Sequence, residues 1–195
     1  MILKVTDILM DLTKCISKKR LCHSIGVMQT AYKLAEVHGA DKDAAIIAGI
    51  LHDYAKEFEH KDMIKLCKEN DIKLSDHELK YPNLIHGKAA SCIAKNKYGI
   101  NDEDILQAIM YHTTGKPGMS KLGKIIYLAD YIEPNRESYD ELEVIRKVAY
   151  ENLDKACYLA ITDCIDYLKN EKGIKIDDVT WSTFEYLKSI AEGEV

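Results

Sequence analysis

The run from Ile46 to Glu57 constrains the fold of this chain more than any other segment. It reads Ile-Ile-Ala-Gly-Ile-Leu-His-Asp-Tyr-Ala-Lys-Glu, and none of its six residues before His52 has a polar side chain. A helix through such a segment is apolar on nearly every face and belongs in a protein interior. Its last turn places His52 beside Asp53, and burying an unpaired imidazole and carboxylate is unfavourable. Because a divalent transition metal binds both groups, the run predicts a buried helix that ends in a metal site.

Two further helical segments supply polar residues of the same kind. His23 lies in the segment 20–26, and Asp130 interrupts the apolar segment 123–132. An unpaired carboxylate in a buried helix would have to protonate, and a metal or a histidine partner removes that need. A hydrogen-bonded core histidine and a helix-end carboxylate are the plainer interpretations. We favour ligation, with a set of two imidazoles and two carboxylates: His23, His52, Asp53 and Asp130.

Such a ligand set suits iron, manganese, cobalt or zinc better than magnesium, which prefers oxygen ligands and water. It leaves one or two coordination positions open for water and substrate. A metal can lower the pKa of bound water from 15.7 to about 7, which gives a hydroxide nucleophile at neutral pH, and it also polarises a phosphoryl oxygen. The ligand set therefore predicts a metal-bound hydroxide as the nucleophile, and phosphorus is one centre that it could attack.

Basic residues and two more histidines could bind a phosphorylated substrate near that metal. Arg20 and Lys56 each lie three residues from a predicted ligand and share its helix face. An arginine fork binds phosphate well, although either residue could instead form a plain salt bridge. His86 begins a predicted helix and His112 ends one, each near a glycine. We expect both histidines to line the site, where they contact phosphate oxygens and the leaving group or bind a second metal.

Helix signals dominate the chain, and strand signals are nearly absent. We expect an all-α bundle of roughly nine helices, which forms a single domain over residues 1–195. Predicted helices include the ranges 18–38, 42–57, 85–98, 102–112 and 121–132. The expected N-caps are Ser17, Asp41, Asn101 and Ser120, and the expected C-terminal glycines are Gly39 and Gly99. The polar stretch 71–83 predicts a loop or lid.

Composition and charge argue against several classes of protein. The formal net charge is −5, and the two signs are mixed along the chain, which is unlike the basic face of a protein that binds nucleic acid polymers. A small phosphorylated ligand could still bind a locally basic pocket. The N-terminus has no basic-then-apolar signal, and no apolar run approaches membrane-spanning length. We therefore expect a cytoplasmic protein that binds neither membranes nor nucleic acid polymers.

The ordered set His23, His52-Asp53 and Asp130 resembles the HD phosphohydrolase superfamily. Within it, the chain looks like the YqeK-type branch of symmetrical diadenosine tetraphosphate hydrolases. The matching motifs follow one another between residues 17 and 136: Arg20-x-x-His23-Ser24, Leu51-His-Asp-Tyr-Ala-Lys56, Leu84-Ile-His-Gly-Lys88, Ala108-Ile-x-Tyr-His-Thr-Thr-Gly115 and Leu128-Ala-Asp-Tyr-Ile-Glu-Pro-x-Arg136. The last two motifs are the most specific.

The resemblance implies symmetrical cleavage of diadenosine tetraphosphate into two ADP, with iron as the metal and manganese, cobalt or zinc as alternatives. It implies that the ligands of this metal are His23, His52, Asp53 and Asp130, and that the catalytic residues are Asp53, His86 and His112. The residues it implies near the nucleotide are Arg20, His23, Lys56, His86, His112, Thr113, Asp130, Arg136 and, beside the base, Ile176.

Three other functions fit parts of the sequence. An HD phosphohydrolase of another nucleotide would show the same residues, and only a substrate panel separates it. A regulatory protein that binds metal and nucleotide without turnover would need no residue for the leaving group, so the two extra histidines argue against it. A structural adaptor would leave the buried carboxylates without a purpose. The assembly state is open, with a homodimer among the options.

Overall fold

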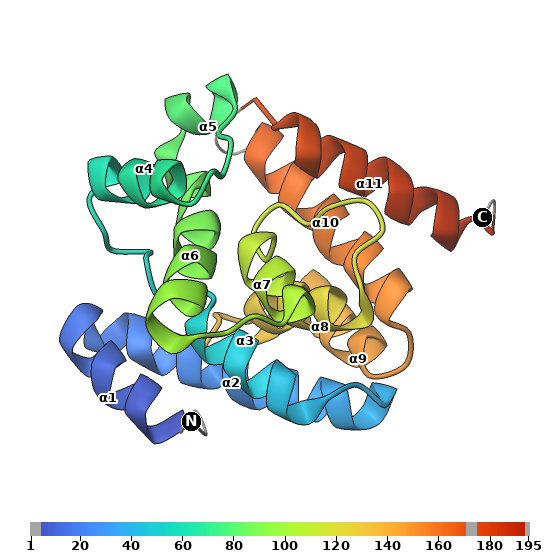
Figure 1. Ribbon diagram of the computed structural model, residues 1–195. Helices are drawn as coiled ribbons and strands as arrows, with labels where there is room; N and C mark the ends of the chain where they lie inside the picture. The colour runs from blue at the N-terminus through green and yellow to red at the C-terminus, as the bar shows by residue number, and fades with distance from the viewer. Residues whose placement is uncertain (1–4, 171–174, 194–195) are drawn as a thin grey trace.

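The computed structural model describes residues 5–170 and 175–193, and within them it contains helices and no strand (Figure 1). The α-helices are α1 (Val5–Cys15), α2 (Lys18–His38), α3 (Lys42–Leu51), α4 (His60–Glu69), α5 (Asp76–Lys80), α6 (His86–Tyr98), α7 (Glu103–Met110), α8 (Lys121–Ile132), α9 (Asp140–Ala149), α10 (Leu153–Asn170) and α11 (Asp178–Ala191), and a 3-10 helix, η1 (Pro82–Leu84), precedes α6. The prediction of an all-α bundle is confirmed. The described residues form eleven α-helices, where the sequence predicts roughly nine, and one of them is the five-residue helix α5 within the predicted loop.

Helix α3 lies at the centre of the bundle, in contact with α1, α2, α6, α7 and α8. It begins where the side chain of Asp41 accepts hydrogen bonds from the backbone N–H groups of Asp43 and Ala44. Its glycine, Gly49, faces α2, where an added Cβ would lie only 2.9 Å from the Cα of Met28. The sequence thus lets α2 and α3 approach closely, and these two helices carry the predicted ligands His23 and His52.

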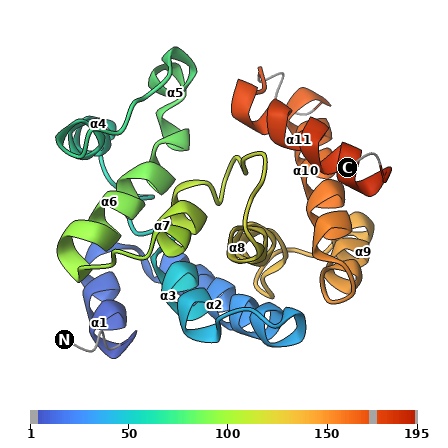
Figure 2. The ribbon, with the colours of Figure 1, turned by 45° about the vertical axis from the view of Figure 1, so that its right-hand side comes forward.

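Helix α8 joins the two sides of the molecule. It contacts α2, α3 and α7 on one side and α9 and α10 on the other, and Figure 2, which views α8 nearly end-on, shows it between these groups. Most of its residues are buried apolar side chains, and Asp130, whose side chain is 20% exposed, lies beside α2 and the end of α3. No helix in the described part of the chain is long and apolar enough to cross a membrane.

The caps Ser17, Asp41 and Ser120 are confirmed, and so are the left-handed C-terminal glycines Gly39 and Gly99. The prediction of Asn101 as a cap is wrong: Asp102 accepts from the N–H groups of Asp104 and Ile105, so α7 begins one residue later.

Two predicted helices end earlier than expected. Helix α3 ends at Leu51 rather than Glu57, and residues 52–57 form turns. Helix α7 ends at Met110, two residues before His112. No glycine or proline directly follows either end, so the sequence has no clear stop signal there. The predicted loop 71–83 contains α5 and η1. The sequence Ile-Lys-Ile at 174–176 also predicts a short extended connector, and its first residue belongs to the segment 171–174, which lies outside the described residues.

Candidate metal and phosphate site

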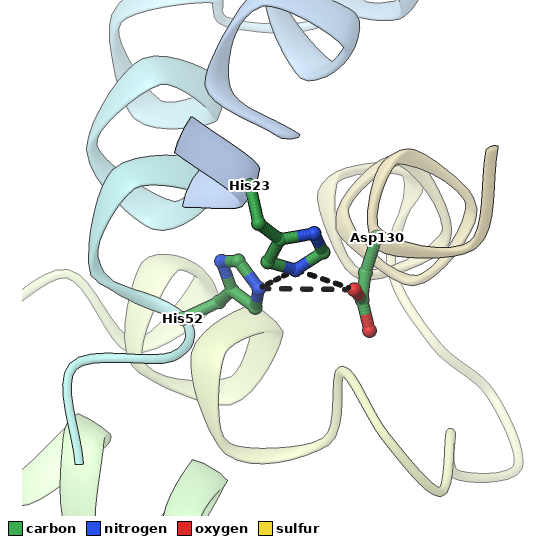
Figure 3. A group of neighbouring side chains, drawn as sticks. All are labelled: His23, His52 and Asp130. Atoms are coloured by element: carbon green, nitrogen blue, oxygen red, sulfur yellow. Dashed lines mark hydrogen bonds and ion pairs between the residues drawn. The ribbon is translucent and has the colours of Figure 1, made fainter. Parts of the chain in front are cut away.

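The predicted ligands come from α2, from the turn directly after α3 and from α8, and Figure 3 shows His23, His52 and Asp130 converging on one point. Nε2 of His23, in the second turn of α2, lies 3.1 Å from Oδ1 of Asp130 in α8. Nε2 of His52, directly after α3, lies 3.3 Å from Nε2 of His23 and 3.8 Å from the same Asp130 oxygen. Asp53 completes the group, because its Oδ2 lies 3.5 Å from Nε2 of His23 and 3.4 Å from Nε2 of His52.

The chemistry of these donor atoms fits a cation. Nδ1 of His52 donates a hydrogen bond to the carbonyl oxygen of Gly49 at 2.7 Å, and Nδ1 of His23 donates to Oε1 of Glu133 at 3.1 Å. In a neutral imidazole whose proton is on Nδ1, Nε2 carries a lone pair. Two lone pairs and two carboxylates therefore face one another, an arrangement that a divalent metal would stabilise.

His86 and His112 form a second group on the other side of Asp53. Their Nδ1 atoms donate to the carbonyl oxygens of Asn83 at 2.6 Å and Ile109 at 2.8 Å, and their Nε2 atoms lie 2.9 Å apart. Oδ1 of Asp53 lies 3.0 Å and 3.5 Å from these Nε2 atoms. It is nevertheless buried without a hydrogen-bond partner, because both nitrogens are acceptors. Asp53 thus turns one oxygen to each histidine pair.

The charges of the site follow from its burial and its ion pairs. Burial alone would raise the pKa of Asp53, but the positive charge of His52, when a proton takes the place of a metal on it, holds that pKa well below its usual range. Asp53 in turn raises the pKa of His52 against the effect of burial. The pKa of Asp130 is likewise lowered by His23 and Arg136 against the effect of burial. Burial lowers the pKa of His86 to about 4. At neutral pH the two aspartates are anionic and His86 is a neutral base.

Three predicted phosphate-binding side chains surround this group. A guanidinium nitrogen of Arg20 donates to Oδ2 of Asp53 at 2.6 Å, and Arg136 donates to Oδ1 of Asp130 at 2.9 Å. Nζ of Lys56 lies 3.2 Å from Nε2 of His86. The structure therefore brings these cations together at the site, each in contact with one of its acids or bases.

Thr113 connects the site to a cavity of about 460 Å³. Its hydroxyl oxygen lies 3.0 Å from Nε2 of His112, and the residue also lines the cavity. The other walls come from the α5 segment, from α6 and α7, and from the start of α11, including Lys175 and Asp177. Ile176, predicted near the base, stands between these two residues and packs against the core.

A family model described as the HD domain matches residues 20–135, the stretch that contains the residues described above except Arg136 and part of the cavity wall. The chain belongs to the HD domain family. The predicted resemblance is confirmed, and the helical bundle is the fold of this family.

Relatives of this HD domain protein include two that are named bis(5'-nucleosyl)-tetraphosphatase, symmetrical. The one from Halalkalibacterium halodurans is 42% identical over 155 residues, which cover 78% of this chain and 81% of the relative. The one from Bacillus subtilis is 40% identical over 176 residues, which cover 89% and 92%. A crystal structure of a predicted HD superfamily hydrolase involved in NAD metabolism, from Clostridium acetobutylicum, is 40% identical, with a TM-score of 0.91 over 96% of this chain and 98% of that chain.

One residue at the site of this HD domain protein, Glu133, is not among the site residues that the sequence predicts. Its side chain is 2% exposed and accepts the hydrogen bond from His23. The available signal was its position: a carboxylate between the apolar helix that carries Asp130 and the helix-ending Pro134. Such a residue reads equally well as an exposed helix-end acid, and only the fold places it against α2.

Proposed function

We propose that this HD domain protein hydrolyses diadenosine tetraphosphate symmetrically to two ADP. The observation that carries the proposal is the convergence of His23, His52, Asp53 and Asp130, whose ligand atoms face one another and suit a divalent cation. The relatives named symmetrical bis(5'-nucleosyl)-tetraphosphatase, at 40% and 42% identity, support this choice of substrate.

The four residues would hold a divalent metal through Nε2 of each histidine and one oxygen of each aspartate. We propose iron as the resident ion, with manganese, cobalt and zinc acceptable to the same ligands. When bound, such an ion polarises a phosphoryl oxygen and acidifies a coordinated water. The burial of the ligands and the fixed direction of both imidazoles would keep bulk water away from that chemistry.

The cationic side chains bind and orient the phosphates. Arg20 and Arg136 already contact Asp53 and Asp130, and each guanidinium keeps further N–H donors that can reach a phosphate beside those carboxylates. Lys56 lies on the side of the two other histidines. Each charge-assisted contact would contribute about 1.5–3 kcal/mol to binding the polyanionic substrate.

His86 and His112 hold and move a proton near the leaving group. Because the pKa of His86 is lowered to about 4, its Nε2 offers a lone pair at neutral pH and can accept a proton. Lys56 lies within hydrogen-bond distance of that atom and can donate one. Asp53 faces both pairs of histidines, so it would act as metal ligand and as the link to this proton-holding pair.

The position of the cavity supports symmetrical cleavage. Its volume is within the range of small-molecule pockets, and we propose that it receives one nucleoside. The phosphate chain would then pass Thr113 and place its second phosphorus at the ligand group. Attack of water on that phosphorus breaks the bond to the next bridging oxygen, so one ADP leaves and the other ADP stays. Attack at a neighbouring phosphorus would give ATP and AMP.

Chromatography of the products of a single turnover tests this function. Protein loaded with iron, manganese or cobalt under reducing conditions should convert diadenosine tetraphosphate to ADP alone. Equal amounts of ATP and AMP, or no turnover with any of the three metals, would refute the proposal. Hydrolysis rates measured in parallel for mononucleotides and NAD⁺ show whether another phosphate compound is hydrolysed faster than diadenosine tetraphosphate.

Two further proposals concern the location and the assembly of the protein. The first is a cytoplasmic location, tested by fractionation of the source cells. The second concerns assembly, for which a monomer and a homodimer are the two options. Light scattering on the metal-loaded protein separates them.

A further inference from the structure

His23 differs from the other three histidines in how its Nδ1 atom is held. His52, His86 and His112 each donate to the backbone carbonyl three residues earlier in the chain. These residues lie at or beyond helix ends, where carbonyl groups lack partners within the helix. His23 lies inside α2, where the carbonyls one turn back accept hydrogen bonds from the helix itself. Its Nδ1 therefore needs a partner from elsewhere in the chain, and that partner is Glu133.

Glu133 is held firmly in the position that His23 requires. Its Oε2 accepts hydrogen bonds from the backbone N–H of Asn135 at 2.7 Å and from the side-chain amide of the same residue at 2.8 Å. This leaves Oε1 for Nδ1 of His23 at 3.1 Å. Both oxygens of a carboxylate that is only 2% exposed are thus in use, and the last turn of α8 is fixed against α2.

A glycine in α2 provides the space for this carboxylate. Gly26 lies three residues after His23 and therefore on the same face of the helix. A Cβ added at this position would lie 2.4 Å from Oε2 of Glu133 and 2.8 Å from the amide nitrogen of Asn135, well inside contact distance. Any larger residue here would push the carboxylate away from the imidazole.

We propose that Glu133 is a positioning residue of the metal site. It keeps the proton of His23 on Nδ1, so that Nε2 presents its lone pair to the metal, and its negative charge makes that imidazole a stronger ligand. Gly26 and Asn135 serve this contact. The inference rests on the metal ligands of the proposed function and is independent of the substrate.

The first test compares Co²⁺ binding by the wild type and by E133Q. The glutamine side chain has the same shape, but it has no charge, and its amide cannot accept from both Asn135 and His23. Competition with a chelator should show Co²⁺ affinity reduced by about 10- to 100-fold, with a changed visible spectrum of the bound ion. Circular dichroism should show an unchanged helical content.

A second set of variants keeps the inference testable if E133Q folds poorly. G26A should weaken Co²⁺ binding in the same direction, because its methyl group displaces Glu133. In the E133A background the same change should have no further effect, since the carboxylate that it displaces is absent. G123A is the matched control: this buried glycine of α8 has no atom within 3.4 Å of an added Cβ, so Co²⁺ affinity should stay within twofold of the wild type.

The outcomes separate this inference from the proposed function. Equal Co²⁺ affinity and equal spectra for wild type, E133Q and G26A would overturn the role of Glu133 and leave the metal site standing. A wild type that binds no Co²⁺ would overturn both. An effect of G26A that persists unchanged in the E133A background would show that the glycine acts through helix packing and not through the carboxylate.

Discussion

Replacing Gly87 by alanine tests whether the spacing of His86 and His112 matters for catalysis and not for metal binding. Gly87 lies at the start of α6, against the end of α7. An added Cβ would lie 2.7 Å from the carbonyl oxygen of Met110, 3.1 Å from that of Ile109 and 3.2 Å from Nδ1 of His112. The first two atoms belong to the backbone and cannot rotate away, so α6 and α7 must separate.

The size of the effect follows from these distances. A Cβ essentially never lies within 3.0 Å of a backbone atom, and ordinary contact begins at 3.4 Å, so the helices must move apart by 0.3 to 0.7 Å. A misplacement of about 1 Å can lower the rate about 100-fold, and on that scale the shift between the two Nε2 atoms predicts a fall in kcat of about 4- to 25-fold. Overpacking should lower the free energy of unfolding by about 1–3 kcal/mol, and the better helix propensity of alanine should return about 1 kcal/mol of this. The Tm of G87A should therefore fall by less than about 8 °C.

The assay measures kcat, KM and Co²⁺ affinity for G87A and for the control G123A. We expect kcat of G87A to fall while Co²⁺ affinity stays within about twofold of the wild type, because no metal ligand lies on α6 or α7. G123A should match the wild type in all three values. An unchanged kcat in G87A would refute the role of the His86–His112 pair. A loss of half the bound metal would instead show that this pair binds a second ion.

Further substitutions test the other contacts of the site. His52→Ala and Asp53→Ala should each abolish metal retention and hydrolysis while circular dichroism still reports a helical protein; either variant with metal and activity retained would contradict the ligand assignment. His86→Ala and His112→Ala should retain at least one metal and lose rate, measured by metal analysis beside a turnover assay. Gly49→Ala should weaken metal binding and lower the free energy of unfolding by about 1–3 kcal/mol, because its Cβ would push α3 from α2; equal metal affinity and denaturant midpoint would contradict that packing.

The sequence predicts the ligand-bearing helices well because buried carboxylates and histidines stand out against apolar neighbours. It predicts their ends less well. Helix α3 ends at Leu51, where Nδ1 of His52 donates a hydrogen bond to the carbonyl oxygen of Gly49. No glycine or proline follows Leu51 directly to mark this end in the sequence. The helix end is therefore a property of the site, and a pattern of hydrophobic residues cannot reveal it.

The sequence contains a signal for the short helix α5, although its composition predicts a loop. Ser75 and Glu78 form a reciprocal capping box, a spacing that sequence rules recognise, but the polar composition of residues 71–83 favoured a loop. Glu133 is a different case. Its partner lies 110 residues earlier in the chain, and no local rule connects the two positions.

The hydrogen bonds of Nδ1 have a consequence for anyone who wishes to rebuild this site in another protein. For His52, His86 and His112 the ring orientation depends on a hydrogen bond to the carbonyl three residues earlier. Each of these histidines can therefore be moved into another protein as a segment of four consecutive residues at a helix end. His23 cannot be moved in this way. It also needs a glycine one turn later in its own helix and a second segment, residues 133–135, at the end of a neighbouring helix. A designer who copies only the four ligands would reproduce the coordination but leave one imidazole free to turn.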